Sequence, residues 1–306
     1  MAAELAQIEQ AEIAEIIDGK GIADSIHAEV KNEAEIFNRT YGRFPGLAFI
    51  LVGANPASQI YVRNKGKACA ATGIYSVTDT LPEDITEATL LARIDELNAD
   101  DTIDGILVQL PLPKHINEEK VIERISPAKD VDGFHPISLG RLMIGADTMF
   151  PCTPSGILEL LKRSGVKTEG KHVVVVGRSN IVGKPVANML LQKKKGANAV
   201  VTICHTGAPD VAVFTRQADI LIAAMGSPES IRGEHLKQGV VVIDVGMNRI
   251  PDATTKSGTR LTGDVHFASA REIASKITPV PGGVGPMTIA MLLKNTVKAA
   301  MLRKNE

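Results

Sequence analysis

Residues 171–185 decide the fold of this chain, and they read KHVVVVGRSNIVGKP. The four consecutive valines are typical of a β-strand that is covered on both faces, as in a parallel sheet. Gly177 then makes a tight turn, and a helix follows. The N–H groups and the dipole at such a helix start favour a pyrophosphate. We therefore predict a nucleotide site here, although the spacing meets only half of the usual G-x-G-x-x-G pattern and also fits a turn without a ligand.

The next strand indicates which nucleotide would bind. A site for NAD places an acidic residue at the end of that strand, where it binds the ribose 2′-hydroxyl. Residues 199–204 form this predicted strand, and His205 and Thr206 follow it without a carboxylate. Because Arg178 stands in the glycine turn, the sequence favours a 2′-phosphate and hence NADP. The lysine run at 193–195 adds positive charge nearby, although such a run at a helix end is usually solvated.

Apolar, β-branched runs alternate with helical patterns along the whole chain, which predicts an α/β fold with mostly parallel sheets. The chain has 306 residues, so two domains are expected. The predicted strands are 47–52, 74–78, 103–110, 172–176, 199–204, 220–223 and 240–245. The predicted helices are 22–39, 58–72, 87–98, 155–163 and 287–302.

A stretch rich in proline at 149–154 predicts the domain boundary, and Ser155 is a candidate cap for the helix after it. We expect an α/β domain at 1–150 and a Rossmann-like NADP-binding domain at 151–286, with a cleft between them. The last helix, within 287–306, is expected to pack back onto the first domain.

The composition excludes several classes of protein. A net charge of −1 and 3% aromatic residues argue against nucleic-acid binding and against an anionic membrane as a partner. Three dispersed cysteines and seven scattered histidines predict neither a metal site nor a disulfide framework, and they suit a reducing cytoplasm. No apolar run reaches membrane-spanning length. The first 17 residues are acidic rather than basic, so we expect a frayed or helical extension instead of a targeting peptide.

Tyr61 and Lys65 are the first candidates for chemistry, because a helix would project both from one face, one turn apart. A lysine held against a phenol, away from bulk water, can lose its proton near neutral pH and transfer protons. The alternative is a lysine on a solvated face, where most lysines lie.

Three further segments carry candidate ligand contacts. Asp132, in an Asp-Gly turn, can accept paired hydrogen bonds from a guanidine-like edge such as that of a pterin, whereas His135 nearby is expected to be structural. Gln109 ends a predicted strand, where its amide can hold a lysine amine or simply bond to backbone. Residues 278–288 are rich in glycine and proline, which lets a flat ligand approach the backbone and also suits a rigid connector.

Taken together, four blocks make the chain resemble the bifunctional methylenetetrahydrofolate dehydrogenase/cyclohydrolase family of the FolD type. They are PASQIYV at 56–62, VQLPLP at 108–113, KDVDGF at 129–134 and PGGVGPMT at 281–288. The resemblance runs from IDGK at 17–20 to the last helix. It implies that NADP oxidises 5,10-methylenetetrahydrofolate to the 5,10-methenyl compound, which is then hydrolysed to 10-formyltetrahydrofolate. It also implies a cytoplasmic homodimer that serves one-carbon metabolism and purine biosynthesis.

The resemblance also implies a role for individual residues. Lys65 would be the proton-transfer group, with Gln109 holding its amine, Tyr61 packing along the pterin and Asp132 binding the pterin amino edge. The implied substrate contacts are Tyr61, Val62, Arg63, Asn64, Lys65, Val108, Gln109, Leu110, Asp132, Pro281, Gly282, Gly283, Val284 and Gly285. The implied cofactor contacts are Gly177, Arg178, Ser179, Thr206, Met247 and Thr288, and no metal is implied.

Two other classes of protein share part of these motifs. A short-chain dehydrogenase also uses a Tyr-x-x-x-Lys pair, but its glycine-rich loop precedes the pair, whereas here Lys65 precedes Gly177 by a whole domain. A nucleotide-sensing module would keep the Gly177 turn without needing Lys65, Gln109 and Asp132 together. Relatives often carry arginine or serine where this chain has Thr206, so the preference for NADP over NAD stays open.

Overall fold

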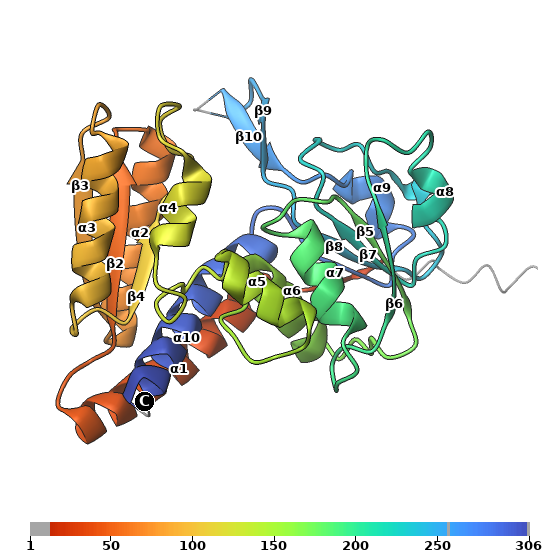
Figure 1. The fold of residues 1–306 in the computed structure, drawn as a ribbon. Helices are drawn as coiled ribbons and strands as arrows, with labels where there is room; N and C mark the ends of the chain where they lie inside the picture. Colours follow the sequence, from red (N-terminus) through yellow and green to blue (C-terminus); the bar gives the residue numbers. More distant parts are fainter. Residues whose placement is uncertain (1–12, 256–257, 305–306) are drawn as a thin grey trace, which may run out of the picture. The chain divides into compact units, whose positions relative to one another are not determined.

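The computed structural model describes residues 13–255 and 258–304, and these residues form two compact units (Figure 1). The six-stranded unit comprises the described residues up to Lys20 together with 157–285. The three-stranded unit comprises 21–156 together with the chain from Pro286 onward. Each unit has a parallel sheet with helices, so the predicted α/β fold class is confirmed.

The sheet of the six-stranded unit is parallel throughout and has the order β1-β11-β8-β7-β5-β6. Its strands are β5 (His172–Val176), β6 (Val200–Cys204), β7 (Ile220–Ala223), β8 (Val241–Asp244), β11 (Lys276–Ile277) and β1 (Glu15–Ile16). The helices α7 (Gly183–Leu191), α8 (Ala212–Thr215) and α9 (Phe267–Arg271) and the short η1 (Gly233–His235) connect them. An antiparallel ribbon, β9 (Asn248–Pro251) with β10 (Thr259–Thr262), follows β8.

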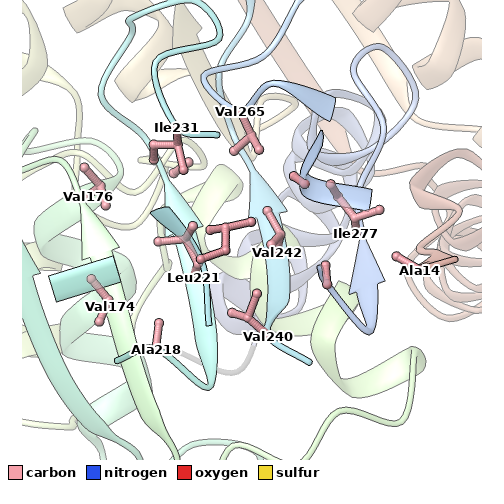
Figure 2. Close-up of a cluster of buried hydrophobic side chains, with 14 of the residues drawn as sticks. Ala14, Val174, Val176, Ala218, Leu221, Ile231, Val240, Val242, Val265 and Ile277 are labelled. Atoms are coloured by element: carbon pink, nitrogen blue, oxygen red, sulfur yellow. The ribbon is translucent and has the colours of Figure 1, made fainter. Parts of the chain in front are cut away.

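The core of this unit lies along the central strands. Val174 and Val176 of β5 pack in one apolar cluster with Leu221 of β7 and Val242 of β8 (Figure 2). Residues 173–176 are all fully buried, which is why this strand reads as an unbroken run of valines. The central strands are therefore covered on both faces, and β6 lies at one edge of the sheet.

The sheet of the three-stranded unit has the order β3-β2-β4, and its strands are parallel. They are β2 (Gly46–Val52), which is wholly buried at the centre, β3 (Tyr75–Leu81) and β4 (Gly105–Val108). The helices α2 (Pro56–Thr72), α3 (Glu87–Ala99), α4 (Glu118–Arg124) and α5 (Pro136–Met143) belong to this unit. Most of α1 (Gly19–Tyr41) and α10 (Val284–Lys304) also lies here, while α6 (Cys152–Arg163) contributes to both units.

Four local expectations were wrong. Glu15–Ile16 is a strand paired with β11 rather than a frayed or helical end, while residues 1–12 lie outside the described part. α6 begins at Cys152, so Ser155 lies inside that helix and does not cap it. β4 ends at Val108 instead of residue 110. The lysine run at 193–195 follows the end of α7 at the sheet edge opposite the Gly177 turn, so it adds no charge beside that turn, and its residues are exposed as the solvated alternative expected.

Among the described residues, no helix combines the length and the apolar composition needed to cross a membrane.

Candidate active site

Helix α2 carries the predicted tyrosine–lysine pair, and local signals define where the helix begins and ends. The side chain of Asn55 accepts hydrogen bonds from two amides of the first turn, and Pro56 occupies the first helical position. Gly73 ends the helix in the left-handed conformation with φ +78°. One stripe of the helix is buried, and it consists of Ser58, Val62, Lys65, Cys69 and Thr72. Lys65 therefore belongs to the inward face of α2.

The other predicted α2 contacts are distributed around the helix. Lys65 is only 9% exposed, whereas Tyr61, one turn earlier, is 42% exposed and lies at the margin of the buried stripe. Val62 is part of that stripe, so its side chain packs inward. Arg63 and Asn64 are exposed, and Arg63 points ~160° away from Lys65 around the helix. The helix thus brings Tyr61 and Lys65 to one side but turns Arg63 to the other.

Gln109 lies beside Lys65, as predicted from its position at a strand end. Lys65 Nζ donates a hydrogen bond of 3.1 Å to Gln109 Oε1. The backbone N–H of Gln109 donates to Ile50 O at 2.9 Å, directly after the buried end of β4 at Val108. Its side-chain Nε2 donates to Leu110 O at 2.8 Å, so the amide oxygen faces the lysine. Both open interpretations of Gln109 therefore hold together, because one amide group bonds to backbone and to lysine.

Asp132 completes this group in the three-stranded unit. Burial raises the pKa of the Asp132 carboxyl, and the lysine ammonium of Lys65 opposes that rise. The charge of Asp130 adds to the rise, and a hydrogen bond with the thiol of Cys152 opposes it. The Lys65 amine, the Gln109 amide and the Asp132 carboxyl, whose pKa is raised, thus lie around one position. This arrangement suits proton transfer and the binding of a polar ring edge.

The loop that presents Asp132 is held by its neighbour Asp130. The buried Asp130 carboxylate accepts hydrogen bonds from the N–H groups of Phe134 and His135, at 3.2 and 2.9 Å, and from the Ser138 hydroxyl at 2.8 Å. Gly133 has φ +74°, and a Cβ there would meet backbone of residue 151 at 2.5 Å. His135 Nδ1 accepts a bond from the first turn of α5, so the structural role expected for this histidine is confirmed.

Two residues of this site were not found by sequence reasoning. The Cys152 thiol donates to Val131 O at 3.3 Å, and Asn295 Nδ2 donates to Val131 O and Phe150 O at 2.8 and 2.9 Å. Burial and the charge of Asp132 raise the pKa of the Cys152 thiol. Asn295 stands between Lys294 and Thr296 in the sequence, so no local pattern marked it as a residue of this site.

The predicted nucleotide turn lies after β5 in the six-stranded unit and requires two glycines. Gly177 has φ +135°, and a Cβ there would lie 2.1 Å from Ala224 O. A Cβ on Gly183 would lie 2.2 Å from Gly177 O. The hydroxyl oxygen of Ser179 accepts hydrogen bonds of 3.1 and 3.3 Å from amides at the start of α7. Arg178 is exposed beside it, so the turn can present a positive charge to an anion at the start of α7.

The glycine-rich segment at 281–285 belongs to the same unit and packs closely against its own chain. A Cβ on Gly283 would lie 2.5 Å from Pro279 O, so a larger residue cannot occupy this position without displacing backbone. A Cβ on Gly285 would lie 3.0 Å from the terminal methyl of Met247, which follows β8. The structure therefore brings Met247 to this segment, while their proposed ligand contacts stay predictions.

The two threonines predicted to contact the cofactor lie in different units. Thr206 is exposed in the turn after β6, where His205 Nδ1 accepts a 3.0 Å hydrogen bond from Gly207 N. Thr288 lies in α10, within the three-stranded unit, and its hydroxyl shares a 3.0 Å hydrogen bond with the hydroxyl of Thr153. Thr206 is thus grouped with the Gly177 turn in one unit, whereas Thr288 is not.

These features define a two-domain α/β protein whose larger sheet has the glycine turn of a nucleotide-binding fold. Residues 17–132 match the family model for the catalytic domain of tetrahydrofolate dehydrogenase/cyclohydrolase. Residues 151–304 match the model for the NAD(P)-binding domain of the same family. The chain belongs to the tetrahydrofolate dehydrogenase/cyclohydrolase family.

Named relatives cover almost the whole chain. It is 56% identical to the bifunctional protein FolD of Chlorobium chlorochromatii, over 93% of this chain and 97% of that protein. The crystal structure of the FolD dehydrogenase/cyclohydrolase from Campylobacter jejuni is similar with a TM-score of 0.89 and 48% identity, covering 95% of this chain and 99% of that one. A Trypanosoma brucei FolD complexed with NADP cofactor and inhibitor has a TM-score of 0.90 and 42% identity, covering 96% and 99%.

Proposed function

We propose that this protein oxidises 5,10-methylenetetrahydrofolate to 5,10-methenyltetrahydrofolate with NADP and hydrolyses the product to 10-formyltetrahydrofolate. Membership of the family and the bifunctional relatives support both activities. The observation that carries the proposal is the covered Lys65 amine, which bonds to Gln109 at 3.1 Å and interacts with the charge of Asp132. The oxidised and formylated folates place the protein in one-carbon metabolism.

In the dehydrogenase step a hydride leaves a carbon that is flanked by two nitrogens, whose lone pairs stabilise the resulting cation. The position of this carbon against the nicotinamide therefore matters more than the presence of a strong base. We assign cofactor binding to the six-stranded unit, with contacts from Gly177, Arg178, Ser179, Thr206 and Met247. Thr288 is a further candidate. A Cβ on Gly177 or Gly183 would collide with backbone, so the two glycines let the turn pack tightly between β5 and α7, as in dinucleotide-binding turns, which supports this assignment.

The choice of NADP over NAD rests on charge at the end of β6. This strand is followed by His205 and Thr206, and neither can repel a 2′-phosphate as a carboxylate would. Arg178 is exposed in the glycine turn and supplies a positive partner. The relative from Trypanosoma brucei, whose structure holds NADP, also supports this choice.

In the cyclohydrolase step, water attacks the methenyl cation and must lose a proton. We assign Lys65 as the group that accepts this proton and returns it when the ring opens. Gln109 orients the amine, Asp132 binds the amino edge of the pterin, and Tyr61 packs along its ring. The remaining predicted folate contacts are Val62, Arg63, Asn64, Val108, Leu110 and the segment 281–285, and they stay predictions.

We further propose that the protein is a homodimer in the cytoplasm. β6 lies at the edge of its sheet, and two of its apolar side chains, Val200 and Ile203, are 62% and 44% exposed. An apolar sheet edge of this kind supports pairing with a second copy. The three cysteines are free and buried, which suits a reducing compartment.

An assay with 5,10-methylenetetrahydrofolate tests the proposed function most directly. NADP and NAD are compared side by side, and the appearance and the decay of the methenyl compound are followed separately. We expect appearance to require a nicotinamide nucleotide and to be faster with NADP, and decay to proceed without any nucleotide. Absence of either reaction would count against the corresponding activity.

A further inference from the structure

Two buried carboxylates of the six-stranded unit take no part in the chemistry proposed above. Asp244, the last residue of β8, is 3% exposed, and Asp264, which follows β10, is 0% exposed. Within the described ranges 13–255 and 258–304, neither forms an ion pair with a lysine, arginine or histidine. A buried carboxylate without a cation is costly unless many hydrogen bonds compensate it.

Asp264 bonds to two loops and not to the core. Its Oδ2 accepts the N–H groups of Met225 and Gly226 at 2.7 and 2.9 Å. Its Oδ1 accepts the N–H of Ser227 and the side-chain amide of Asn248, both at 2.9 Å. Three successive backbone amides thus point at one carboxylate, in the manner of an anion-binding nest, and Asn248 ties a second loop to the same group.

Asp244 holds Asp264 in place. Its Oδ1 accepts the N–H groups of Gly246 and Asp264, both at 2.9 Å, and its Oδ2 accepts the N–H of Val265 at 2.9 Å. A Cβ on Gly263 would lie 1.8 Å from Asp244 Oδ2, so the chain passes directly over this carboxylate. Burial, with the charge of Asp264 among the further causes, raises the pKa of Asp244 to about 7.

The loops that Asp264 binds lie where a cofactor would be received. Residues 225–227 follow β7 and residues 246–248 follow β8, so both lie at the carboxyl edge of the parallel sheet. The Gly177 turn is at the same edge, because β5 pairs with β7. Ala224, just before the first loop, bonds to Val176 O at 2.8 Å and closely faces Gly177. Ligands of doubly wound sheets bind at this edge.

The segment that carries Asp264 is anchored without its carboxylate. Val265 belongs to the apolar core together with Ile231 (Figure 2). The N–H of Ile231 donates to Asp264 O at 3.0 Å, and the N–H of His266 donates to Ile231 O at 2.7 Å. Packing and backbone hydrogen bonds already hold this segment. The four hydrogen bonds to the Asp264 carboxylate therefore fix the conformation of the two loops.

We propose that Asp264 is a positioning residue of the dehydrogenase reaction, which holds loops 225–227 and 246–248 in the shape that receives the nicotinamide nucleotide. Asp244 orients Asp264 by accepting hydrogen bonds from the backbone N–H groups of residues 264 and 265. The inference rests on the proposed function, since it assumes that the six-stranded unit binds the cofactor. Asp264 is not a catalytic residue, because it is wholly buried and acts through Met225, Gly226, Ser227 and Asn248.

The two activities of the enzyme make this inference testable with the full-length protein. In Asp264→Asn, an NH₂ group replaces one acceptor oxygen and faces N–H donors, so at least about a tenfold loss of NADP affinity is expected. NADP binding is measured by calorimetry, and dehydrogenase kcat and KM for NADP are measured alongside it. Cyclohydrolase activity is measured on supplied methenyltetrahydrofolate without nucleotide, and it should stay within about twofold of the wild type.

The matched control is Asp219→Asn at the amino edge of the same sheet, where Asp219 accepts His172 N at 3.0 Å and pairs with Lys237 at 2.6 Å. It should leave NADP affinity unchanged. If Asp264→Asn does not fold, Asn248→Ala removes only one of the four bonds and should weaken NADP binding several-fold.

Equal losses of both activities with a matching fall in Tm, or unchanged NADP affinity in both the Asp264 and Asn248 variants, would overturn the inference. Lack of dehydrogenase activity in the wild type would instead contradict the proposed function.

Discussion

The two units present their candidate sites by different means. In the three-stranded unit the site consists of side-chain functional groups, with Lys65, Gln109 and Asp132 gathered from a helix, a strand end and a loop. In the six-stranded unit it consists mainly of backbone, shaped by Gly177 and by the loops that Asp264 holds. Proton transfer needs groups that titrate, whereas nucleotide binding needs N–H donors and close approach. Substitutions should therefore separate the two activities.

The largest effect is expected from Lys65→Met. Hydrolysis of the methenyl compound should fall about 10³-fold, because a positioned general base contributes about 10²–10⁴-fold. Oxidation of the methylene compound should persist, and the decay of methenyl absorbance measures the difference. Lys67→Met is the matched control, since this lysine lies on the same helix but is exposed. Unchanged hydrolysis in the Lys65 variant would remove its role as the proton acceptor.

Gly177→Ala tests the backbone site. The new Cβ would meet Ala224 O at 2.1 Å and strain a residue at φ +135°. NADP affinity should fall about 100-fold, while hydrolysis of methenyltetrahydrofolate continues. Gly170→Ala is a control for alanine at positive φ away from the turn, because Gly170 has φ +68° at the opposite edge of the same sheet with open space around it. If both variants lose NADP equally, strain alone explains the loss and the turn is not a binding site.

Asp132→Ala should weaken the binding of folate more than the binding of NADP, and the effect should be smaller than those of the two substitutions above. Loss of hydrogen bonds to a charged group should weaken folate binding about 10–100-fold and change NADP binding by less than about twofold. Equilibrium titrations with each ligand measure the two affinities. Equal losses for folate and NADP would mean that Asp132 supports the fold and does not contact the pterin.

The last expected effect concerns the pH dependence of stability and not the two activities. The pKa of Asp244 is raised to about 7 in the folded protein, above its ordinary value of 3.8, because burial disfavours the carboxylate. Between these values the folded state binds more protons than the unfolded state, so this group's contribution to stability falls as pH rises through the window.

The free energy of unfolding of the wild type relative to Asp244→Asn should decrease by about 2–3 kcal/mol from pH 5 to pH 8. Denaturant titrations of both proteins measure this difference, and groups that titrate in both cancel. A difference that does not change with pH would show that Asp244 does not titrate in this range.

Much of the larger sheet could be predicted because its central strands are buried on both faces. β5 and β7 begin and end at the predicted residues 172–176 and 220–223, since a strand without a solvent face contains apolar residues throughout. β1 could not be predicted, because its two residues are a strand only by pairing with β11, some 260 residues later in the chain.

The candidate site shows the same limit at the level of side chains. Helical spacing predicted that Tyr61 and Lys65 share a face, and it also places Arg63 on the opposite side. Strand-end position predicted Gln109 as a partner for a lysine. Cys152 and Asn295 were missed, because nothing close in sequence links them to the loop of Asp132.

Local sequence patterns determined the strands, the glycine turn, the helix of Lys65 and the family, because each depends on residues within about one element of one another. Only the tertiary structure decided which polar groups meet. The four bonds of Asp264 join residues 225–227 and 248, and the bond between Lys65 and Gln109 spans 44 positions. Buried polar groups must find partners wherever the fold brings a donor close, and that proximity is a property of packing rather than of spacing along the chain.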